Sequence, residues 1–267
     1  MTSPSAIPPV LLVGGGRMGS AMMAGWQEAG LEPSFAVDPA LPALGAGVAV
    51  VADAGSVPLG FRPGAVVLAV KPQAAAEVAP LYARWARDGA VVLSIMAGRT
   101  LPGLRAVLGE GAAVVRAMPN TPAAIGQGIT VAVAGPGVST AQRGLCDTLL
   151  RAAGAVEWVE DEALMDAVTA VSGSGPAYVF LLAELLAEAA VAQGIPPGLA
   201  ARLARHTVAG SGAMLARSAE PADALRRAVT SPGGTTERAL GVLMAEWPAA
   251  VERAVDAATR RSRELSG

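Results

Sequence analysis

Short apolar runs alternate with longer segments of helical periodicity through residues 1–161. Most runs are too short for helices, are bounded by glycine or proline, and are apolar throughout, as in strands buried on both faces of a parallel sheet. We expect strands at 10–13, 35–37, 48–51, 65–70, 90–96, 113–117, 129–134 and 155–159. We expect helices at 20–29, 73–87, 101–108 and 140–153. This alternation predicts a doubly wound α/β domain.

From residue 163 onward the strand signals stop and helical patterns follow, which predicts a domain boundary near Asp161. The two predicted domains are residues 1–161 and an all-α domain of residues 162–267. In the second, segment 177–193 is apolar nearly all round, apart from Glu184 and Glu188. Such a helix is usually buried on all sides, and a domain of about 100 residues is too small to surround it. We therefore expect a second copy of the chain to cover it, giving a homodimer.

The first predicted strand is followed at once by the pattern GxGxxG, formed by Gly14, Gly16 and Gly19 with Arg17 and Met18 between the last two. Between a strand and a helix, this pattern is typical of Rossmann dinucleotide binding. Gly14 would make the turn, Gly16 would let the backbone approach a pyrophosphate, and Gly19 would let helix and strand pack closely. In a chain with 32 glycines, the alternative is a purely structural turn.

The second predicted strand ends at Asp38, where a Rossmann fold places an acidic side chain that binds the ribose hydroxyls. The alternative is an acidic residue that only starts the turn at Pro39. No lysine or arginine occurs between Arg17 and Arg62, so a 2′-phosphate would meet Asp38 with little compensating positive charge. The sequence therefore favours NADH over NADPH as the cofactor.

Residues at the carboxyl ends of the strands are further candidates for cofactor contact, because ligands of doubly wound sheets bind there. They are Ala69, Val70, Lys71, Pro72, Ala97, Gly98 and Asn120. Lys71 is the only lysine of the chain. At this strand end the Lys71 side chain could face the cofactor, or it could equally be a loop residue whose charge is solvated.

A second glycine-rich turn lies in the helical half, at residues 230–237 with the sequence TSPGGTTE. Pro232 and Gly233 suit the second and third positions of a β-turn, where φ is negative and then positive. The following helix would begin near Gly234 and carry Glu237 in its first turn.

The start of this helix would present free N–H groups beside the hydroxyls of Thr235 and Thr236. Such a helix end could bind a small carboxylate. The alternative is a plain turn that opens a plain helix.

Composition and charge narrow the class of function. With a net charge of −2, the protein has no overall positive potential that would attract nucleic acid or an anionic membrane. The single Cys146 allows no intrachain disulfide and suits a reducing, cytoplasmic compartment. We expect neither a signal peptide, since residues 1–9 lack its features, nor a membrane span, since the longest uncharged stretch, 117–142, is broken by prolines.

An acidic cluster surrounds the predicted domain boundary: Glu157, Glu160, Asp161, Glu162 and Asp166. It raises the question of a metal site, but there is no second histidine nearby and no ligand spacing. We interpret it as a linker and a first helical turn, where negative charge is favourable, and expect no metal. The one histidine, His206, is expected on a helix surface or interface rather than as a catalytic acid.

Two segments of the helical half carry a specific resemblance. SGSGPAY at 172–178 and TSPGGTT at 230–236 resemble pyrroline-5-carboxylate reductase, a family of enzymes that make proline. The resemblance covers nearly the whole chain, including GxGxxG, AVKP at 69–72 and MPNTP at 118–122. It implies an NAD(P)H-binding N-terminal domain and a helical domain that forms a dimer with shared active sites, possibly in a ring of dimers.

The resemblance also implies residue roles at the second turn. The substrate-binding residues would be Glu220, Ser231, Gly233, Gly234, Thr235 and Thr236, with Thr236 as the catalytic residue near the ring nitrogen. Two departures from the family stand out. The family commonly uses NADPH, which Asp38 opposes, and Ala228 stands where many members carry an amide side chain that can contact the cofactor.

The implied activity is NAD(P)H-dependent reduction of 1-pyrroline-5-carboxylate to L-proline. A protonated cyclic imine is already electrophilic, so hydride transfer needs positioning and a hydrogen-bonding group at nitrogen but no strong protein base. One alternative is a β-hydroxyacid-dehydrogenase-like enzyme, which would use a catalytic lysine in its helical part, where this chain has none. Another is a catalytically silent dinucleotide-binding regulatory protein.

Overall fold

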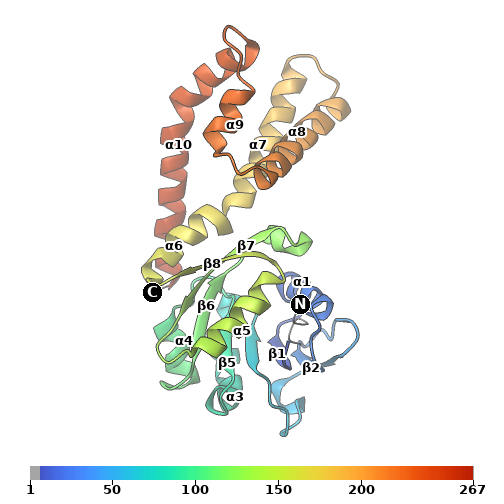
Figure 1. The fold of residues 1–267 in the computed structure, drawn as a ribbon, viewed down its shortest axis with the longest axis vertical. Coiled ribbons are helices and arrows are strands. Elements are labelled where there is room, and N and C mark those ends of the chain that lie inside the picture. The colour runs from blue at the N-terminus through green and yellow to red at the C-terminus, as the bar shows by residue number, and fades with distance from the viewer. Residues whose placement is uncertain (1–6, 267) are drawn as a thin grey trace. The chain divides into compact units, whose positions relative to one another are not determined.

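The computed structural model describes residues 7–266, shown in Figure 1. The expectation that the chain carries no signal peptide falls mainly on residues 1–6, outside the described residues. Contacts between Cα atoms divide the chain into two compact units. The first unit is Met1–Gly173 with Ala258–Gly267, and the second is Ser174–Ala257.

Within the described residues, the strands form one eight-stranded sheet, which belongs to the first unit. The strands are β1 (Val10–Val13), β2 (Ser34–Val37), β3 (Val48–Val51), β4 (Ala65–Leu68), β5 (Val91–Ser94), β6 (Val114–Met118), β7 (Gly128–Ala134) and β8 (Gly154–Val159). Their order is β3-β2-β1-β4-β5-β6-β7-β8. The chain thus proceeds outward from β1 in one direction and then crosses back to β4 on its other side, which confirms the predicted doubly wound fold.

One strand pairing departs from the expected parallel sheet. β7 runs antiparallel to β6, pairing Met118 with Val131, and β8 then runs parallel to β7 at the sheet edge. The cause is the short connection from β6 to β7, which contains only the 3₁₀ turn η4 (Thr121–Ile125). Parallel neighbours need a longer crossover, usually through a helix.

The helices of the sheet unit interleave with its strands. They are α1 (Arg17–Glu28), α2 (Ala75–Val78), α3 (Ala83–Arg87), α4 (Leu101–Leu108) and α5 (Thr140–Arg151), with 3₁₀ turns η1 (Ala54–Ser56), η2 (Pro72–Ala74) and η3 (Ala79–Tyr82). The predicted helical segment 73–87 is helical throughout, but as a succession of short α-helices and 3₁₀ turns rather than one continuous α-helix. Pro80 is a physical reason for a break, since proline lacks an N–H and its ring clashes with the preceding helical turn.

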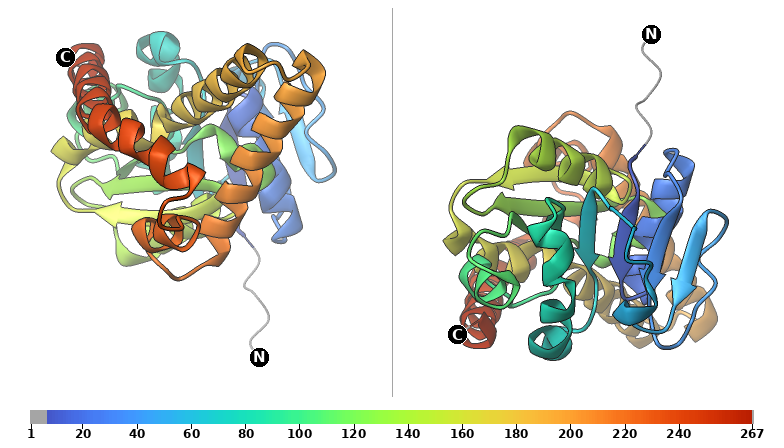
Figure 2. Two further views of the ribbon diagram at one scale, coloured as in Figure 1. Left: turned by 90° about the horizontal axis from the view of Figure 1, so that it is seen from above. Right: turned by 90° about the horizontal axis from the view of Figure 1, so that it is seen from below.

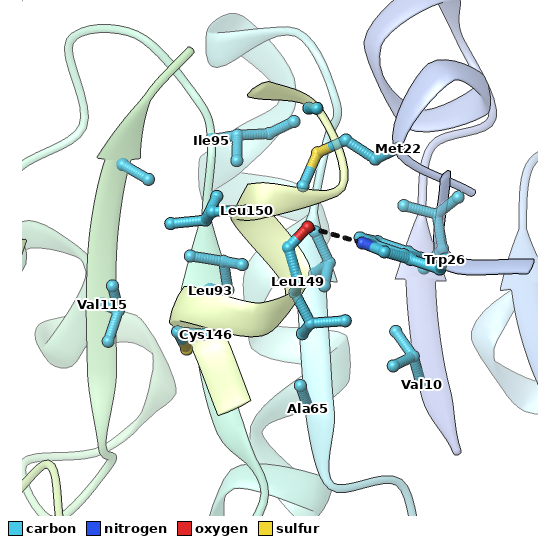
Figure 3. Packing of buried hydrophobic residues seen from close by; sticks show 14 of the residues in the cluster. Val10, Met22, Trp26, Ala65, Leu93, Ile95, Val115, Cys146, Leu149 and Leu150 are labelled. Atoms are coloured by element: carbon cyan, nitrogen blue, oxygen red, sulfur yellow. Dashed lines mark hydrogen bonds between the residues drawn. The ribbon is translucent and has the colours of Figure 1, made fainter. Parts of the chain in front are cut away.

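Helices cover both faces of the sheet, as Figure 2 shows. On one face, Met22 and Trp26 of α1 pack with Leu149 and Leu150 of α5 in a continuous core. The indole N–H of Trp26 donates to the backbone oxygen of Leu149 at 2.7 Å, which links the two helices (Figure 3). The segments η3, α3 and α4 cover the opposite face. Their buried side chains include Tyr82, Trp85 and Leu104.

The segment after β8 packs with the sheet unit before the chain leaves it. It contains η5 (Glu162–Leu164), α6 (Met165–Val168) and the π-helical turn η6 (Thr169–Gly173). Met165 and Ala170 are fully buried. Helical structure therefore begins near the predicted boundary at Asp161. The first compact unit nevertheless extends to Gly173, because apolar side chains of this segment pack into that unit's core.

The second unit is entirely helical. It holds α7 (Gly175–Ala192), α8 (Pro197–Arg217), α9 (Ala222–Ala228) and the first part of α10 (Thr235–Ser266), whose last residues return to the sheet unit. A single chain does not provide the expected burial of α7, since Phe180 is 67% and Leu181 52% exposed. An apolar face of this size needs cover from outside the chain.

Candidate functional site

The glycine turn between β1 and α1 has the geometry of a phosphate cradle. Gly14 has φ of 98°, and a Cβ added at Gly19 would lie 2.1 Å from the Gly14 oxygen, so both positions require glycine. A Cβ added at Gly16 would meet nothing within 4 Å, which leaves the backbone there open to a ligand. The first intrahelical bond of α1 comes from the N–H of Ser20, so the N–H groups of Arg17, Met18 and Gly19 precede the helical ladder. This arrangement fits a pyrophosphate.

Asp38 lies directly beside this cradle. Its Oδ2 accepts a hydrogen bond of 2.7 Å from the N–H of Gly15, and its Oδ1 accepts one of 2.8 Å from the N–H of Ala40. This second role of Asp38, beside the predicted contact with the ribose, cannot be inferred from its position after an apolar strand. The carboxylate braces the glycine turn against the end of β2, and its remaining lone pairs stay available to a ligand.

The predicted strand-end residues fall into two places. Ala69 backs the glycine turn: its N–H donates to Val13 at 2.8 Å, and a Cβ on Gly14 would lie 2.8 Å from its oxygen. Val70 and Pro72 are partly buried beside it, and Lys71 is exposed at the start of η2. Ala97 and Gly98 form the turn after β5, where Gly98 has φ of 67°.

Asn120 has a structural contact that the sequence did not suggest. Its side-chain oxygen accepts a hydrogen bond of 3.0 Å from the N–H of Ile129. The residue therefore closes the connection between β6 and β7. Its predicted contact with the cofactor stays a prediction.

The second turn, in the helical unit, has the predicted conformation. The N–H of Gly234 donates to the oxygen of Ser231 at 3.0 Å, and Gly233 has φ of 72°. α10 begins at Thr235, directly after this turn, and Glu237 Oε2 accepts a hydrogen bond of 2.9 Å from the N–H of Gly233.

The beginning of α10 presents the groups expected of a carboxylate site. The N–H of Arg238 is the first to bond within the helix, to Gly234 at 3.3 Å, so those of Thr235 and Thr236 precede the ladder. The Thr235 side chain is exposed and that of Thr236 is partly buried. Glu220 is not part of this turn: it lies between α8 and α9, and its N–H donates to Ser218 Oγ at 3.1 Å.

The acidic residues near the end of β8 have partners within the protein. The carboxylate of Asp161 accepts a hydrogen bond from the N–H of Ala163, Glu160 pairs with Arg143, and Asp166 accepts a hydrogen bond from Ser262. Over residues 7–266, no group of three His, Cys, Asp or Glu side chains has the arrangement of a metal site. His206 is exposed on α8.

An ion pair that was not predicted from the sequence joins a buried arginine to a partly buried glutamate. Arg116 in β6 is 4% exposed, and its Nη1 lies 2.8 Å from Glu162 Oε1, which also accepts the N–H of Leu101 at 2.7 Å. The signal was present, because a lone arginine in an apolar strand needs a buried partner. The pair joins β6 to the start of α4 and to the segment that follows β8.

The lone cysteine is not a nucleophile. Cys146 on α5 is fully buried, and burial raises the pKa of its thiol to about 12. A thiol needs its thiolate form to attack a substrate.

Comparison with known proteins places the chain in a family. It is 39% identical to a pyrroline-5-carboxylate reductase of Pseudomonas aeruginosa, over 97% of each chain. This chain belongs to the pyrroline-5-carboxylate reductase family. A reductase of Haemophilus influenzae is 36% identical, over 96% of this chain and 97% of the relative.

Solved structures of pyrroline-5-carboxylate reductases share the fold over the whole chain. One from Coxiella burnetii has a TM-score of 0.89 at 33% identity and covers 98% of this chain and 99% of its own. One from Plasmodium falciparum, with NADP bound, has a TM-score of 0.82 at 27% identity, with the same coverage. The family's doubly wound sheet and helical region are thus those of this chain.

The family profile described as pyrroline-5-carboxylate reductase dimerisation matches residues 162–265. The match includes α7, whose exposed apolar side chains are left uncovered by one chain. By length and composition alone, the helical run Glu162–Ala192 is also apolar enough to cross a membrane. Four carboxylates, at Glu162, Asp166, Glu184 and Glu188, lie within this run, so none of its uncharged stretches is as long as 117–142. The dimerisation match covers this same run, and a dimer interface uses apolar side chains of this kind.

Proposed function

We propose that this protein catalyses the reduction of 1-pyrroline-5-carboxylate to L-proline with NAD(P)H, the last step of proline biosynthesis. The observation that carries the proposal is the 39% identity to a pyrroline-5-carboxylate reductase over 97% of both chains. The open glycine turn at Gly16 supports it, as does the helix start at Thr235. In this proposal the protein is an oxidoreductase that acts on a C=N bond.

The turn at the start of α10 is proposed as the substrate site. Ser231, Gly233 and Gly234 shape the turn, and the N–H groups of Thr235 and Thr236 bind the substrate carboxylate. The Thr236 hydroxyl accepts a hydrogen bond from the N–H of the protonated imine and so orients the ring for hydride transfer. Glu220 assists from the α8–α9 connection, as the family resemblance implies.

The sheet unit is proposed as the cofactor site. Gly14, Gly16 and Gly19, with the N–H groups of Arg17 and Met18, hold the pyrophosphate, and Asp38 holds the adenosine ribose. The strand-end residues Ala69, Val70, Lys71, Pro72, Ala97, Gly98 and Asn120 line the rest of the site. When bound, the reduced dinucleotide supplies the hydride that goes to C5 of the pyrroline ring.

NADH is the proposed preferred cofactor. The Asp38 carboxylate stands beside the glycine turn, bonded at 2.7 Å to the N–H of Gly15, so a 2′-phosphate at the ribose would approach its negative charge. The Plasmodium falciparum relative carries NADP, and the chain's Asp38 is the reason to expect a different preference here.

The active protein is proposed to be a homodimer in the cytoplasm. The exposed apolar face of α7 supports this, since Phe180 and Leu181 need a covering surface. A ring of dimers is the larger assembly that the resemblance suggests. Residues 1–161 form the dinucleotide-binding domain and residues 162–267 the substrate-binding and dimerisation domain in this proposal.

A β-hydroxyacid-dehydrogenase-like activity is not favoured. It would use a lysine of the helical part, whereas the only lysine, Lys71, lies in the sheet unit at the start of η2. A catalytically silent dinucleotide-binding protein would share the fold, so turnover distinguishes it.

The test is cofactor oxidation by the purified protein with pyrroline-5-carboxylate, run in parallel with NADH and NADPH. Faster oxidation of NADH supports both the reaction and the role of Asp38. Faster oxidation of NADPH supports the reaction and overturns the cofactor preference. No oxidation of either overturns the proposed activity and favours the silent binding protein.

A further inference from the structure

The turns after β4 and β5 are joined by a side chain that the proposed function does not use. The Arg99 guanidinium, next to Gly98, donates from both Nε and Nη2 to the backbone oxygen of Pro72, with the Nε contact at 2.9 Å. Arg99 is partly buried. Two donors of one planar group fix the position of this oxygen more tightly than a single donor would.

The last turn of α10 lies against the same place. Gly98 has φ of 67°, and a Cβ added there would lie 3.2 Å from the backbone oxygen of Leu265. Gly98, Arg99 and Ser266 also line one small pocket of about 100 Å³. The end of α10 is therefore the surface against which the turn after β5 rests.

A carboxylate anchors that end of α10. Ser262 is 6% exposed, and its hydroxyl donates to Asp166 Oδ1 at 2.6 Å. The Ser266 hydroxyl donates to the backbone oxygen of Ser262 at 3.0 Å. This bond ties the last residue of α10 to the turn that Asp166 holds. All these residues belong to the first unit, so the anchor lies within one compact body.

We propose that Arg99 is a positioning residue for the dinucleotide, and that the α10 terminus anchored by Asp166 is the support that holds the Gly98–Arg99 turn in place. Arg99 sets the distance between the turn after β4 and the turn after β5. The proposed function assigns both of these turns to the cofactor site. The inference rests on that assignment. It requires no contact between Arg99 and the cofactor itself.

The experiment measures the dissociation constants of NADH and NADPH for the purified full-length protein, without substrate, from the fluorescence of the bound nicotinamide. Arg99→Ala is expected to weaken both by about tenfold, the order of loss that follows a small misplacement of positioning groups. Arg99→Lys keeps one donor and should recover part of the affinity. The two cofactors should be affected equally, since Arg99 contacts the turn after β4 and not Asp38 at the end of β2.

Two further variants complete the design. Ser262→Ala removes the contact with Asp166 and should weaken both cofactors in the same direction but less. Arg87→Ala, a change at an exposed arginine on α3, is the matched control and should bind both cofactors as the wild type does.

The outcomes separate the inference from the proposed function. Wild-type protein that binds NADH but does not turn over pyrroline-5-carboxylate overturns the activity alone, and the comparison of variants still stands. Arg99→Ala with wild-type affinity, or Arg99→Lys no better than Arg99→Ala, overturns the positioning role. Wild-type protein that binds neither cofactor overturns both.

Discussion

The Asp38 carboxylate accepts a hydrogen bond of 2.7 Å from the N–H of Gly15, the middle glycine of the turn between β1 and α1. One side chain thus joins the end of β2 to the glycine turn that is proposed to hold the pyrophosphate. The carboxylate expected to select between NADH and NADPH also holds the backbone of this glycine turn in place. Substitutions of Asp38 must therefore distinguish the loss of its charge from the loss of its hydrogen bond to Gly15.

Replacement of Asp38 tests the cofactor preference. Asp38→Ser removes the negative charge and should shift the ratio of kcat/KM values toward NADPH. It also weakens the brace on Gly15, so the affinity for NADH should fall by about tenfold, equivalent to one lost charge-assisted hydrogen bond. Asp38→Asn is the matched variant, because its amide oxygen can still accept one backbone N–H. An unchanged cofactor ratio in both variants would place the ribose contact elsewhere.

Removal of the Thr236 hydroxyl tests the substrate site. Thr236→Ala should lower kcat by about a hundredfold, the scale of losing a group that hydrogen-bonds to the reacting atoms, and leave the dissociation constant of NADH unchanged. Thr236→Ser keeps a hydroxyl and should recover much of the turnover. Normal turnover of Thr236→Ala would remove this residue from the mechanism.

The ion pair between buried Arg116 and partly buried Glu162 is expected to matter for stability. Arg116→Ala leaves a partly exposed carboxylate that keeps only the N–H of Leu101, and should lower the free energy of unfolding by about 2 kcal/mol, the scale of one lost hydrogen bond between charged groups. Urea unfolding measures this, at one protein concentration because the proposed dimer couples folding to assembly. Arg143→Ala breaks an exposed pair with Glu160 and should cost less than about 1 kcal/mol. Equal losses would contradict the role of burial.

The exposed face of α7 is expected to form the dimer interface. Phe180→Glu introduces a charge on a side chain that is 67% exposed in one chain, and should convert the dimer to a monomer with little turnover. Light scattering measures the mass. Leu59→Glu is the control: this side chain is 81% exposed in the sheet unit, outside the dimerisation match, and its change should leave the mass unaltered. A dimeric Phe180→Glu variant would move the interface elsewhere.

The thiol of Cys146 should be inert in the folded protein. Burial raises its pKa from 9.0 to about 12, so the thiol stays protonated through neutral and mildly alkaline pH. A thiol-reactive dye at pH 8 should label the native protein very slowly and the protein in concentrated urea at once. Fast labelling of the native state would mean that α5 opens readily from the sheet.

Local patterns were sufficient to locate most elements of the fold. A strand forms at each of the eight predicted apolar runs, most of which are bounded by glycine or proline, and the helix at Leu101–Leu108 begins and ends as expected. Backbone requirements were equally readable: Gly14 and Gly233 have the positive φ that their turns demand. These properties depend on neighbours in sequence, so the sequence contains their causes.

Other properties depend on residues far apart in the chain, and only the tertiary structure decided them. The antiparallel direction of β7, the brace from Asp38 to Gly15, the pairing of Arg116 with Glu162 and the contact of Leu265 with Gly98 each join segments that the fold brings together. The sequence by itself determined the element order, the glycine turns and the family. The structure determined which charges meet, because burial and hydrogen-bond partners arise only when distant segments pack.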